Sequence, residues 1–556
     1  MIQCDRTRPR CNWCHHHDLP CSFTRGRSLS GIVKAGTSGE DTTARSPLAR
    51  SYQPEEPEAN LLLGTMYLCN GVPFFSARGR QWIEAQTGER VALAHYTPPR
   101  RIGLLNPGFP PRPAVFLPDQ DRVRSHLALF KKSVLSDIFP FLEVSLFEET
   151  IETAYSAKND TDAATATARA CIFAFMSIVC VFSKDLNEEN LDTGDDYSSQ
   201  AYHLLPGIFG DSMTVDGLQA ILMLCFYNQT VAGDLLGVEL LLSAATRFVF
   251  HLRANISAPR PPDSKRLTVA GHARKLFWLC YLFSQEITMR TGLAPCLDDV
   301  NCDLTLPAVS ECSPLFLVFI RLGLIQSQVY RRLHAPSAMG QTDAELLCTI
   351  RELDELLEDW RLSIPSSARP TFTCQSTDAE QTEFSVLQLE HHYCMAIIHQ
   401  ASGRCQSWTE NQETSGPASS LAISVEASRS LLRKFSDLEL RFHQYNLMYY
   451  RPDLLFPFPG KYLIIVSSFF LPYLTAAMIH LFCHLLLDPI NAATSADIDL
   501  IAVVPGHLAT RLWPQAPTAL KTQVEYVQGL GVEIQRLSRS AVFNDVRVQG
   551  YLAHKK

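Results

Sequence analysis

The stretch that decides the fold reads Arg274-Lys275-Leu276-Phe277-Trp278-Leu279-Cys280-Tyr281 and continues without a break to Arg290. It is a largely apolar run, longer than an ordinary strand, and it lacks the strict alternation of apolar and polar residues that marks a half-buried strand. Gly292 follows, and a glycine there predicts the end of a helix because it tolerates the left-handed backbone. The stretch therefore predicts a helix that is followed by a loop.

Runs of the same kind precede it from about Leu117 onward. They lie at residues 121–134, 147–154, 163–182, 215–228 and 235–254, and Phe139-Pro140-Phe141 is expected to form a turn. The run 163–182 is apolar on nearly every side, so we expect that helix to be buried. The sequence thus predicts an all-α fold, with a large multi-helix domain over residues 117–550.

The residues Thr342-Asp343-Ala344-Glu345 have the pattern of a capping box, which predicts the start of a helix. Pro365 ends the segment. The apolar residues between them recur at heptad-like spacing, namely Leu346, Ile350, Leu353, Leu357 and Trp360. The apolar face is either a dimer seam or a face packed inside the domain. We favour packing inside the domain, because the run is too short for a coiled coil.

Residues 462–487 carry no charged side chain and are long enough to span a bilayer. Pro472, His480 and His484 suit a lipid-facing helix poorly, so we favour a buried helix at the centre of the domain. His480 and His484 have metal-ligand spacing, but the glutamate of a zincin motif is missing and we interpret them as core histidines. One more amphipathic helix is expected over residues 520–537.

The loop after Gly292 reads Leu293-Ala294-Pro295-Cys296-Leu297-Asp298-Asp299-Val300 and then Asp303-Leu304-Thr305-Leu306-Pro307. Together with the preceding helix it resembles the regulatory domain of fungal transcription factors, the middle homology region. That family has a helix written RRLFW, followed by a loop written GRPPxLDDxDxDxxLP. Residues 235–252 resemble the helix that precedes these two, although Phe248-Val249-Phe250 replace small and glycine residues. The resemblance covers roughly residues 120–480 and implies a regulatory domain.

The first 27 residues contain four cysteines with the spacing C-x6-C-x2-C-x6-C, namely Cys4, Cys11, Cys14 and Cys21. Four thiols in so short a span form either a disulfide set or a metal site. We expect a reducing compartment and therefore zinc, which takes four thiolates in a tetrahedron. The alternative is a Cys/His-rich tail without metal, in which His15, His16 and His17 are solvated.

These cysteines resemble the third to sixth cysteines of the fungal binuclear zinc cluster, and Arg8-Pro9 matches its central loop. The resemblance implies that the first two cysteines and the basic recognition helix would lie before Met1, so the predicted zinc-binding, DNA-binding head of residues 1–27 is incomplete. Basic side chains interleaved with the cysteines are candidates for DNA phosphate contacts, which position a protein without specifying sequence; they are Arg6, Arg8, Arg10, Arg25 and Arg27.

Residues 28–60 are rich in Gly, Ser, Thr, Pro and charge, and we expect a disordered linker. No heptad pattern follows the cysteines, so a coiled-coil dimer is unsupported there. Residues 61–116 are expected to form an ordered strap, which packs Trp82 and Ile83 on the helical domain, and a Pro-rich connection. The predicted domains are therefore 1–27, 28–60, 61–116 and 117–550.

Charge is unevenly distributed along the chain. Residues 1–50 carry eight Lys/Arg and four Asp/Glu, whereas the whole chain of 556 residues has a net charge of −8. Only the head therefore suits nucleic acid. Many of the 17 cysteines lie in apolar surroundings, as small buried side chains do; examples are Cys171, Cys180, Cys225 and Cys280.

Enzyme motifs are not found: the chain has no dinucleotide-binding loop, no Walker loop and no nucleophile elbow. Asp298-Asp299 is the most enzyme-like pair, but adjacent carboxylates in a loop favour a helix cap or a salt bridge over acid–base catalysis. Asp195-Asp196 is expected in a solvated loop. We therefore expect no enzymatic activity.

The two resemblances together imply a nuclear, zinc-dependent, DNA-binding regulator of RNA polymerase II transcription in a fungus. Expected partners are DNA and transcriptional coregulators; a homodimer and a small-molecule inducer stay open, and no membrane partner is expected. The alternative is a helical ligand-binding or interaction protein without sequence-specific DNA binding, and a membrane protein ranks third.

Overall fold

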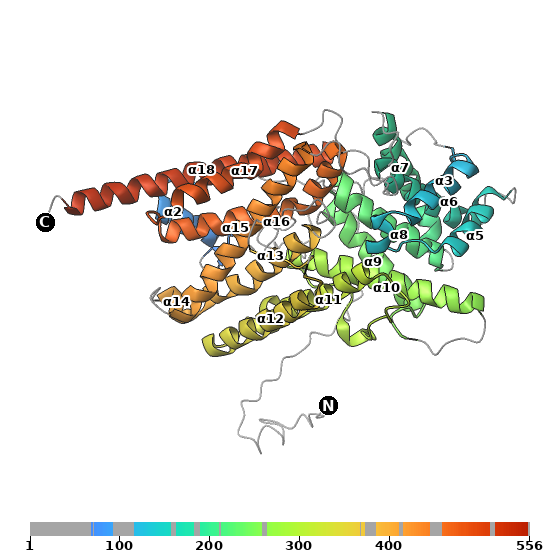
Figure 1. The fold of residues 1–556 in the computed structure, drawn as a ribbon, viewed down its shortest axis with the longest axis horizontal. Coiled ribbons are helices and arrows are strands. Elements are labelled where there is room, and N and C mark those ends of the chain that lie inside the picture. Colours follow the sequence, from blue (N-terminus) through green and yellow to red (C-terminus); the bar gives the residue numbers. More distant parts are fainter. Residues whose placement is uncertain are drawn as a thin grey trace, which may run out of the picture. The chain divides into compact units, whose positions relative to one another are not determined.

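The structure is a computed structural model (Figure 1), and it describes the chain in twelve segments that fall within one structural unit, Glu56–Lys556. The described residues are 68–69, 72–92, 116–156, 163–182, 189–210, 213–257, 264–366, 368–372, 385–410, 415–444, 459–511 and 518–553. The predicted head of residues 1–27 and the linker of residues 28–60 lie outside them.

The first half of the described chain is helical, as predicted. Its elements are α3 Gln120–Lys131, α4 Val134–Ile138, α5 Val144–Tyr155, α6 Ala163–Phe182, α7 Glu189–Gly210, α8 Val215–Tyr227, the π-helical turn η4 Asn228–Ala232, α9 Leu235–His251 and α10 Ser264–Thr291. The apolar run at residues 163–182 forms α6 with the predicted bounds and is buried through most of its length. The predicted turn at Phe139-Pro140-Phe141 separates α4 from α5.

The second half continues in the same way. It contains the 3-10 turn η5 Asp299–Asn301, α11 Pro314–Val329, η6 Tyr330–His334, η7 Pro336–Ala338, α12 Asp343–Ser363, α13 Ser385–Gln400, η9 Ala401–Arg404, α14 Gln406–Glu410, α15 Ser415–Gln444, α16 Pro459–Leu487, α17 Thr494–Arg511 and α18 Thr518–Ala553. The only strands among the described residues are β1 Leu68–Cys69 and β2 Val72–Pro73, an antiparallel pair in which Leu68 faces Pro73. The predicted all-α fold is thus confirmed for the described residues.

Two cores fill the interior of these helices. The N-terminal core takes its buried side chains from Val123 in α3 to Ile320 in α11. The C-terminal core takes them from α2, the end of α10 and the elements from α11 to α18. Helix α10 contributes to both cores, with Trp278 fully buried in the first and Met289 in the second. The stretch that decided the fold therefore joins the two halves.

Helix ends follow the predicted local chemistry. Gly292 has a φ of 71°, the left-handed conformation that glycine allows, and its N–H donates to the Thr288 carbonyl at 2.8 Å. The capping box at Thr342 and Glu345 is present at the start of α12. The heptad-like face of α12 is buried in the C-terminal core, so it packs inside the domain rather than on a second chain.

The loop predicted for Asp195-Asp196 is wrong, because both residues lie within α7. Polar residues and Gly194 hid the helix, yet the buried side chains of α7 recur at helical spacing; they are Tyr197, Ala201, Leu205 and Ile208.

Two helices, α6 and α16, contain long apolar runs. Helix α16 contains the uncharged run, and its residues from Leu471 to Leu486 are buried apart from the half-buried His484. In the described part of the chain, one helical window, Ala163–Cys180, has the length and hydropathy of a membrane crossing, but 78% of it is buried inside the protein. The core position predicted for His480 is confirmed, since its side chain is buried.

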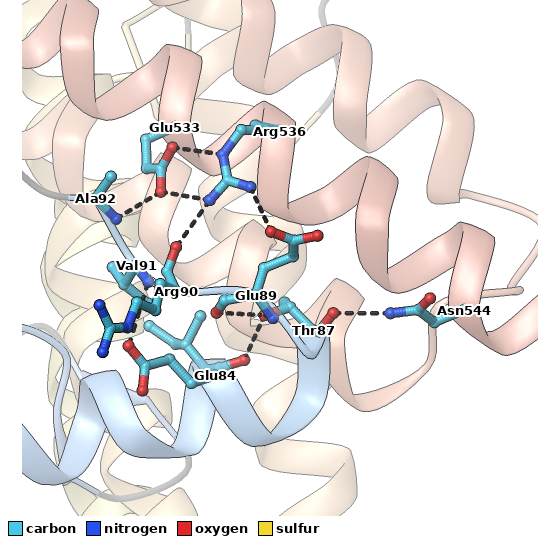
Figure 2. Close-up of polar contacts among 10 residues, drawn as sticks. Glu84, Thr87, Glu89, Arg90, Val91, Ala92, Glu533, Arg536 and Asn544 are labelled. Carbon is cyan, nitrogen blue, oxygen red and sulfur yellow. Dashed lines mark hydrogen bonds and ion pairs between the residues drawn. The ribbon is translucent and has the colours of Figure 1, made fainter.

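Residues 72–92, which we call the strap, pack on the C-terminal helix. The strap contains α2 Ala77–Thr87, and Ile83 is fully buried in the C-terminal core with Trp82 packed against it, as predicted. Figure 2 shows the polar contacts that fasten the strap to α18. Glu533 accepts from the Ala92 N–H at 2.7 Å, and Asn544 donates to the Thr87 carbonyl at 2.7 Å. Segments more than 400 residues apart are thereby held side by side (Figure 1).

Candidate functional site

The site residues predicted from the sequence lie in the head, outside the described residues. This applies to the candidate zinc ligands Cys4, Cys11, Cys14 and Cys21 and to the candidate phosphate contacts Arg6, Arg8, Arg10, Arg25 and Arg27. Within the described residues, no group of three or more His, Cys, Asp or Glu side chains is arranged to hold a metal ion. His480 and His484 therefore do not belong to such a group there.

The loop after α10 is fixed by its two adjacent carboxylates. Asp298 caps η5 by accepting from the Val300 N–H at 3.1 Å. Asp299 accepts from the hydroxyls of Tyr281 and Ser327, both at 2.9 Å, and pairs with Arg331 at 2.8 Å. The predicted cap and salt-bridge roles are both confirmed, and the carboxylates hold the loop on α10 and α11.

Arg274 ties the end of the same loop back to α10. Its guanidinium donates to the carbonyls of Asp303 and Thr305 and lies over the ring of Phe277, 4.4 Å from the ring centroid. A guanidinium that stacks on an aromatic face and donates at its edge is held in one orientation. The loop and helix that carry the family resemblance are thus one structural unit.

A buried group of ionisable side chains, which we call the charge cluster, lies where α10, α13 and α16 meet. It consists of Glu286 and Arg290 from α10, Glu390 from α13 and Tyr473 from α16, all less than 10% exposed. Arg290 pairs with Glu286, one helical turn away. The Tyr473 hydroxyl lies 3.2 Å from Glu286 and 3.0 Å from Glu390, so it bridges the two carboxyl groups.

Two amides complete the charge cluster. Gln229, in the π-helical turn η4, donates to the second oxygen of Glu286, and Gln326 donates to Glu390 at 3.1 Å. A π-helical turn rotates the side chains that follow it, and such turns are frequent at special sites in α-helices. All four carboxyl oxygens of the cluster therefore have a hydrogen-bond partner.

The electrostatics of the cluster favour one ion pair and one neutral acid. Burial, followed by the nearby negative charge of Glu286, raises the pKa of Glu390 to about 8. Glu390 is therefore largely protonated at neutral pH. Glu286, in contrast, pairs with the permanent positive charge of Arg290. One positive and one negative charge remain in the interior, where an unpaired charge would be costly.

A pocket of about 270 Å³ lies where α15 and α16 meet the turn η9 and the short helix α14. Most of its lining is apolar. The residues that line it include Trp408, Leu421, Ala422, Ser424, His480 and Asp488. Asp488 is exposed, and His480 is only 5% exposed.

Ser428 is the hydrogen-bond partner of His480. Its hydroxyl lies 3.0 Å from the Ser424 carbonyl and 3.1 Å from Nδ1 of His480, so its single proton can be donated to either of them. Burial lowers the pKa of His480 to about 3, so the ring is neutral. One ring nitrogen then holds a proton, and the other is an acceptor.

Two polar atoms of the pocket lining are buried without a hydrogen-bond partner among the described residues. One is Nε2 of His480, and the other is the donor Nε1 of Trp408. A buried polar atom without a partner costs about 1–3 kcal/mol. Both atoms are buried, so other atoms of the two side chains line the free space of the pocket.

Sequence reasoning found only part of this arrangement. The sequence drew attention to His480 and His484, which were interpreted as core histidines, but it predicted no pocket there. Trp408 lies more than 70 residues earlier in a short helix without periodicity, so no local pattern could place it there.

The comparison with protein families supports the resemblance of the loop and its helices. Residues 129–314 match the family model of the fungal specific transcription factor domain. The match begins in α3, includes the whole of α10 and the loop held by Asp298 and Asp299, and ends at the first residue of α11. No zinc-cluster family model matches the head.

Curated relatives agree with this match. The chain is 26% identical over 310 residues to an ABC-transporter-regulating transcription factor of Aspergillus fumigatus, covering 51% of this chain and 32% of the relative. It is 27% identical over 295 residues to the protein of the same name in Aspergillus oryzae, covering 48% and 30%. The Fusaridione A cluster transcription factor fsdR of Fusarium heterosporum is 26% identical over 171 residues, covering 28% and 29%. The chain spans about a third of the length of these relatives, all of which are named as transcription factors.

Proposed function

We propose that the chain is a nuclear regulator of RNA polymerase II transcription in a fungus, and that its helical unit is the regulatory domain. The observation that carries this proposal is the family match over residues 129–314, which coincides with the N-terminal core and the loop held by Arg274, Asp298 and Asp299. The relatives are named for different targets, so the proposal is a class of activity rather than a target gene.

The regulatory role is tested by tethering. The full chain is fused to an unrelated DNA-binding domain that has a reporter gene downstream of its site in a fungal host. Expression is expected to change severalfold, in either direction, relative to the DNA-binding domain alone. Unchanged expression from a fusion that accumulates in the nucleus would contradict a regulatory role.

The proposal extends to the head, where Cys4, Cys11, Cys14 and Cys21 bind zinc. Four thiolates fill one tetrahedral site, and structural zinc sites contribute roughly 10–16 kcal/mol in small peptides. Metal analysis of the purified chain under reducing conditions should give about one zinc per chain, and a Cys11→Ser, Cys14→Ser variant should lose it. Equal metal content in the two proteins would rule out this ligand set.

DNA contact is proposed through Arg6, Arg8, Arg10, Arg25 and Arg27. Phosphate contacts alone give weak binding without sequence preference, at a Kd of roughly 10⁻⁴–10⁻⁶ M at physiological salt. Binding-site selection is run on this chain and on a fusion that supplies an upstream C-x2-C-x6 half with its basic helix. The fusion should select short CGG-type half-sites, as the family resemblance implies. Thousandfold selection by the unfused chain would instead place the recognition surface elsewhere.

The second candidate function is a helical ligand-binding or interaction protein without sequence-specific DNA binding. The pocket between α15 and α16 favours it, because it leaves about 270 Å³ of free space with a mostly apolar lining. If neither the fused nor the unfused chain selects a DNA sequence, the second candidate function is favoured over the first.

A further inference from the structure

We propose that the pocket between α15 and α16 binds a small hydrophobic amine, whose apolar body fills the pocket and whose ammonium group lies at the mouth beside the carboxylate of Asp488. Binding itself does not depend on the proposed regulatory function. Only its consequence, that the amine is an effector of the regulatory domain, rests on that function.

The free space of the pocket suits a small apolar body. Its lining includes Leu421, Ala422, Val425 and Leu487, and its volume of about 270 Å³ lies just below the usual range of small-molecule sites. Ala422 is exposed, and Leu421 and Leu487 are half-buried, so part of the lining is accessible to an entering molecule. Burial of apolar surface against these side chains supplies the main part of the affinity.

The charge of the lining is carried by Asp488. This residue is exposed, so its carboxylate is open to a ligand, unlike the buried ring nitrogens of His480 and Trp408. Within the described residues the carboxylate forms no ion pair or hydrogen bond, although the backbone of Asp488 contacts His484 and Asn491. An unpaired carboxylate at the edge of an apolar space attracts a cation and repels an anion.

No second charge at the mouth opposes a cation among the described residues. His484 lies one turn before Asp488, and burial, followed by the nearby charge of Arg429, lowers its pKa, so the ring is neutral at pH 7. The positive charge of Arg429 is already paired with the buried carboxylate of Asp497 through two contacts of 2.8 Å. The negative charge of Asp488 therefore stays uncompensated.

The end of α16 favours the same sign of ligand charge. The helix ends at Leu487, so Asp488 is the first residue after it. The last carbonyl groups of a helix carry a partial negative charge, which disfavours an acidic side chain and favours a cation there. A bound ammonium group is therefore attracted both by Asp488 and by the helix end, and it offsets the repulsion between them.

The test uses the purified full-length chain and three probes that share one ring system, measured by calorimetry at pH 7. The probes are 2-(2-naphthyl)ethylamine, which is a cation, 2-(2-naphthyl)ethanol, which is neutral, and 2-naphthylacetate, which is an anion. We expect the amine to bind about fivefold more tightly than the alcohol, and the anion to bind more weakly than either. Raising the salt concentration should reduce the preference for the amine, because salt screens exposed charges.

Asp488→Asn assigns the preference to one carboxylate. The variant should bind the amine no more tightly than the alcohol, with the affinity for the alcohol unchanged. It should be at least as stable as the parent, because it removes a negative charge from the end of a helix. The matched control is Asp499→Asn, which removes an exposed carboxylate of α17 that does not line the pocket and should keep the full preference.

A second pair of variants assigns the apolar body to the pocket. Ala422→Trp places a large ring at an exposed position of the lining and should weaken the amine and the alcohol at least tenfold. The matched control is Ile423→Trp, since Ile423 is the next residue of α15, is also exposed and does not line the pocket. This control should bind both probes as the parent does.

The outcomes separate this proposal from the regulatory one, because no DNA is present. No binding of the amine or the alcohol would overturn the proposal. Equal affinities for these two probes, a preference that survives Asp488→Asn, or binding that survives Ala422→Trp would also overturn it. A failure of the tethering experiment would leave all of these results unaffected.

Discussion

The charge cluster and the pocket each include a buried polar side chain of α16, but the two regions differ in whether their polar atoms have hydrogen-bond partners. Tyr473 in the charge cluster and His480 in the pocket lie seven residues apart on that helix. In the cluster every carboxyl oxygen has a hydrogen-bond partner. Among the side chains that line the pocket, His480 and Trp408 each keep one buried polar atom without a partner among the described residues.

The difference separates paired charges from unpaired polar atoms. A paired charge in the interior must stay paired, because removing one partner strands the other. An unpaired atom already carries its cost in the folded state, so removing it costs little. Substitutions in the charge cluster should therefore destabilise the fold, and substitutions in the pocket should leave its stability nearly unchanged.

The largest effect is expected for Arg290→Met, which strands the buried carboxylate of Glu286. Breaking a buried ion pair costs roughly 3–5 kcal/mol of unfolding free energy. Denaturant unfolding at pH 7 measures this loss. The double variant Arg290→Met, Glu286→Gln should recover part of it, because no charge is then left alone. A single variant as stable as the parent would place the pair outside the interior.

Next in size is the pH dependence that Glu390 contributes. Its pKa is raised by burial from 4.5 to about 8, so its stabilising contribution is complete below pH 4.5 and is lost as the pH rises to about 8. This group alone should lower the unfolding free energy by roughly 3 kcal/mol between pH 5 and pH 8. Glu390→Gln is neutral in both states, so the decrease should be smaller in the variant by that amount. Parallel pH profiles of the two proteins would show that Glu390 ionises normally.

A smaller loss is expected for Tyr473→Phe, which removes the hydroxyl between the two carboxyl groups. Hydrogen bonds to charged groups are worth about 1.5–3 kcal/mol, and neutral ones about 1 kcal/mol. Tyr393→Phe is the matched control, because Tyr393 is equally buried, packs against Tyr473 and donates to the neutral carbonyl of Met289 at 2.6 Å. Equal losses of unfolding free energy in the two variants would show that the hydrogen bond of Tyr473 to the carboxyl groups is worth no more than the bond of Tyr393 to a neutral carbonyl.

The smallest effect is expected for His480→Phe in the ligand-free protein. The variant loses the contact with Ser428 but also removes an unpaired buried nitrogen, so the unfolding free energy at pH 7 should change by less than about 1 kcal/mol. A loss as large as that of Arg290→Met would mean that His480 is structural, and the contrast between the two regions would fail.

Sequence patterns predicted α6, α8, α9 and α12 and the helix ends at Gly292 and Thr342, because these depend on neighbours a few residues apart, whereas α11, α13, α15 and α17 were not predicted. Thr342 and Glu345 lie one turn apart, and Gly292 stops a helix by its own backbone preference. The charge cluster was beyond such reasoning, since Glu286, Glu390 and Tyr473 come from three distant helices and meet only after the cores pack. Helix α7 was missed in part because its polar residues concealed a regular buried face.

The strap has a consequence for deletion mapping. Removing residues before about 93 strips α2 from α18, and removing residues after about 517 strips α18 from α2, α16 and α17, so the two truncations uncover overlapping parts of the C-terminal core. Truncations from opposite ends should therefore produce overlapping defects. A loss of activity shared by the two series would report one damaged surface, not two separate functional regions at the ends of the chain.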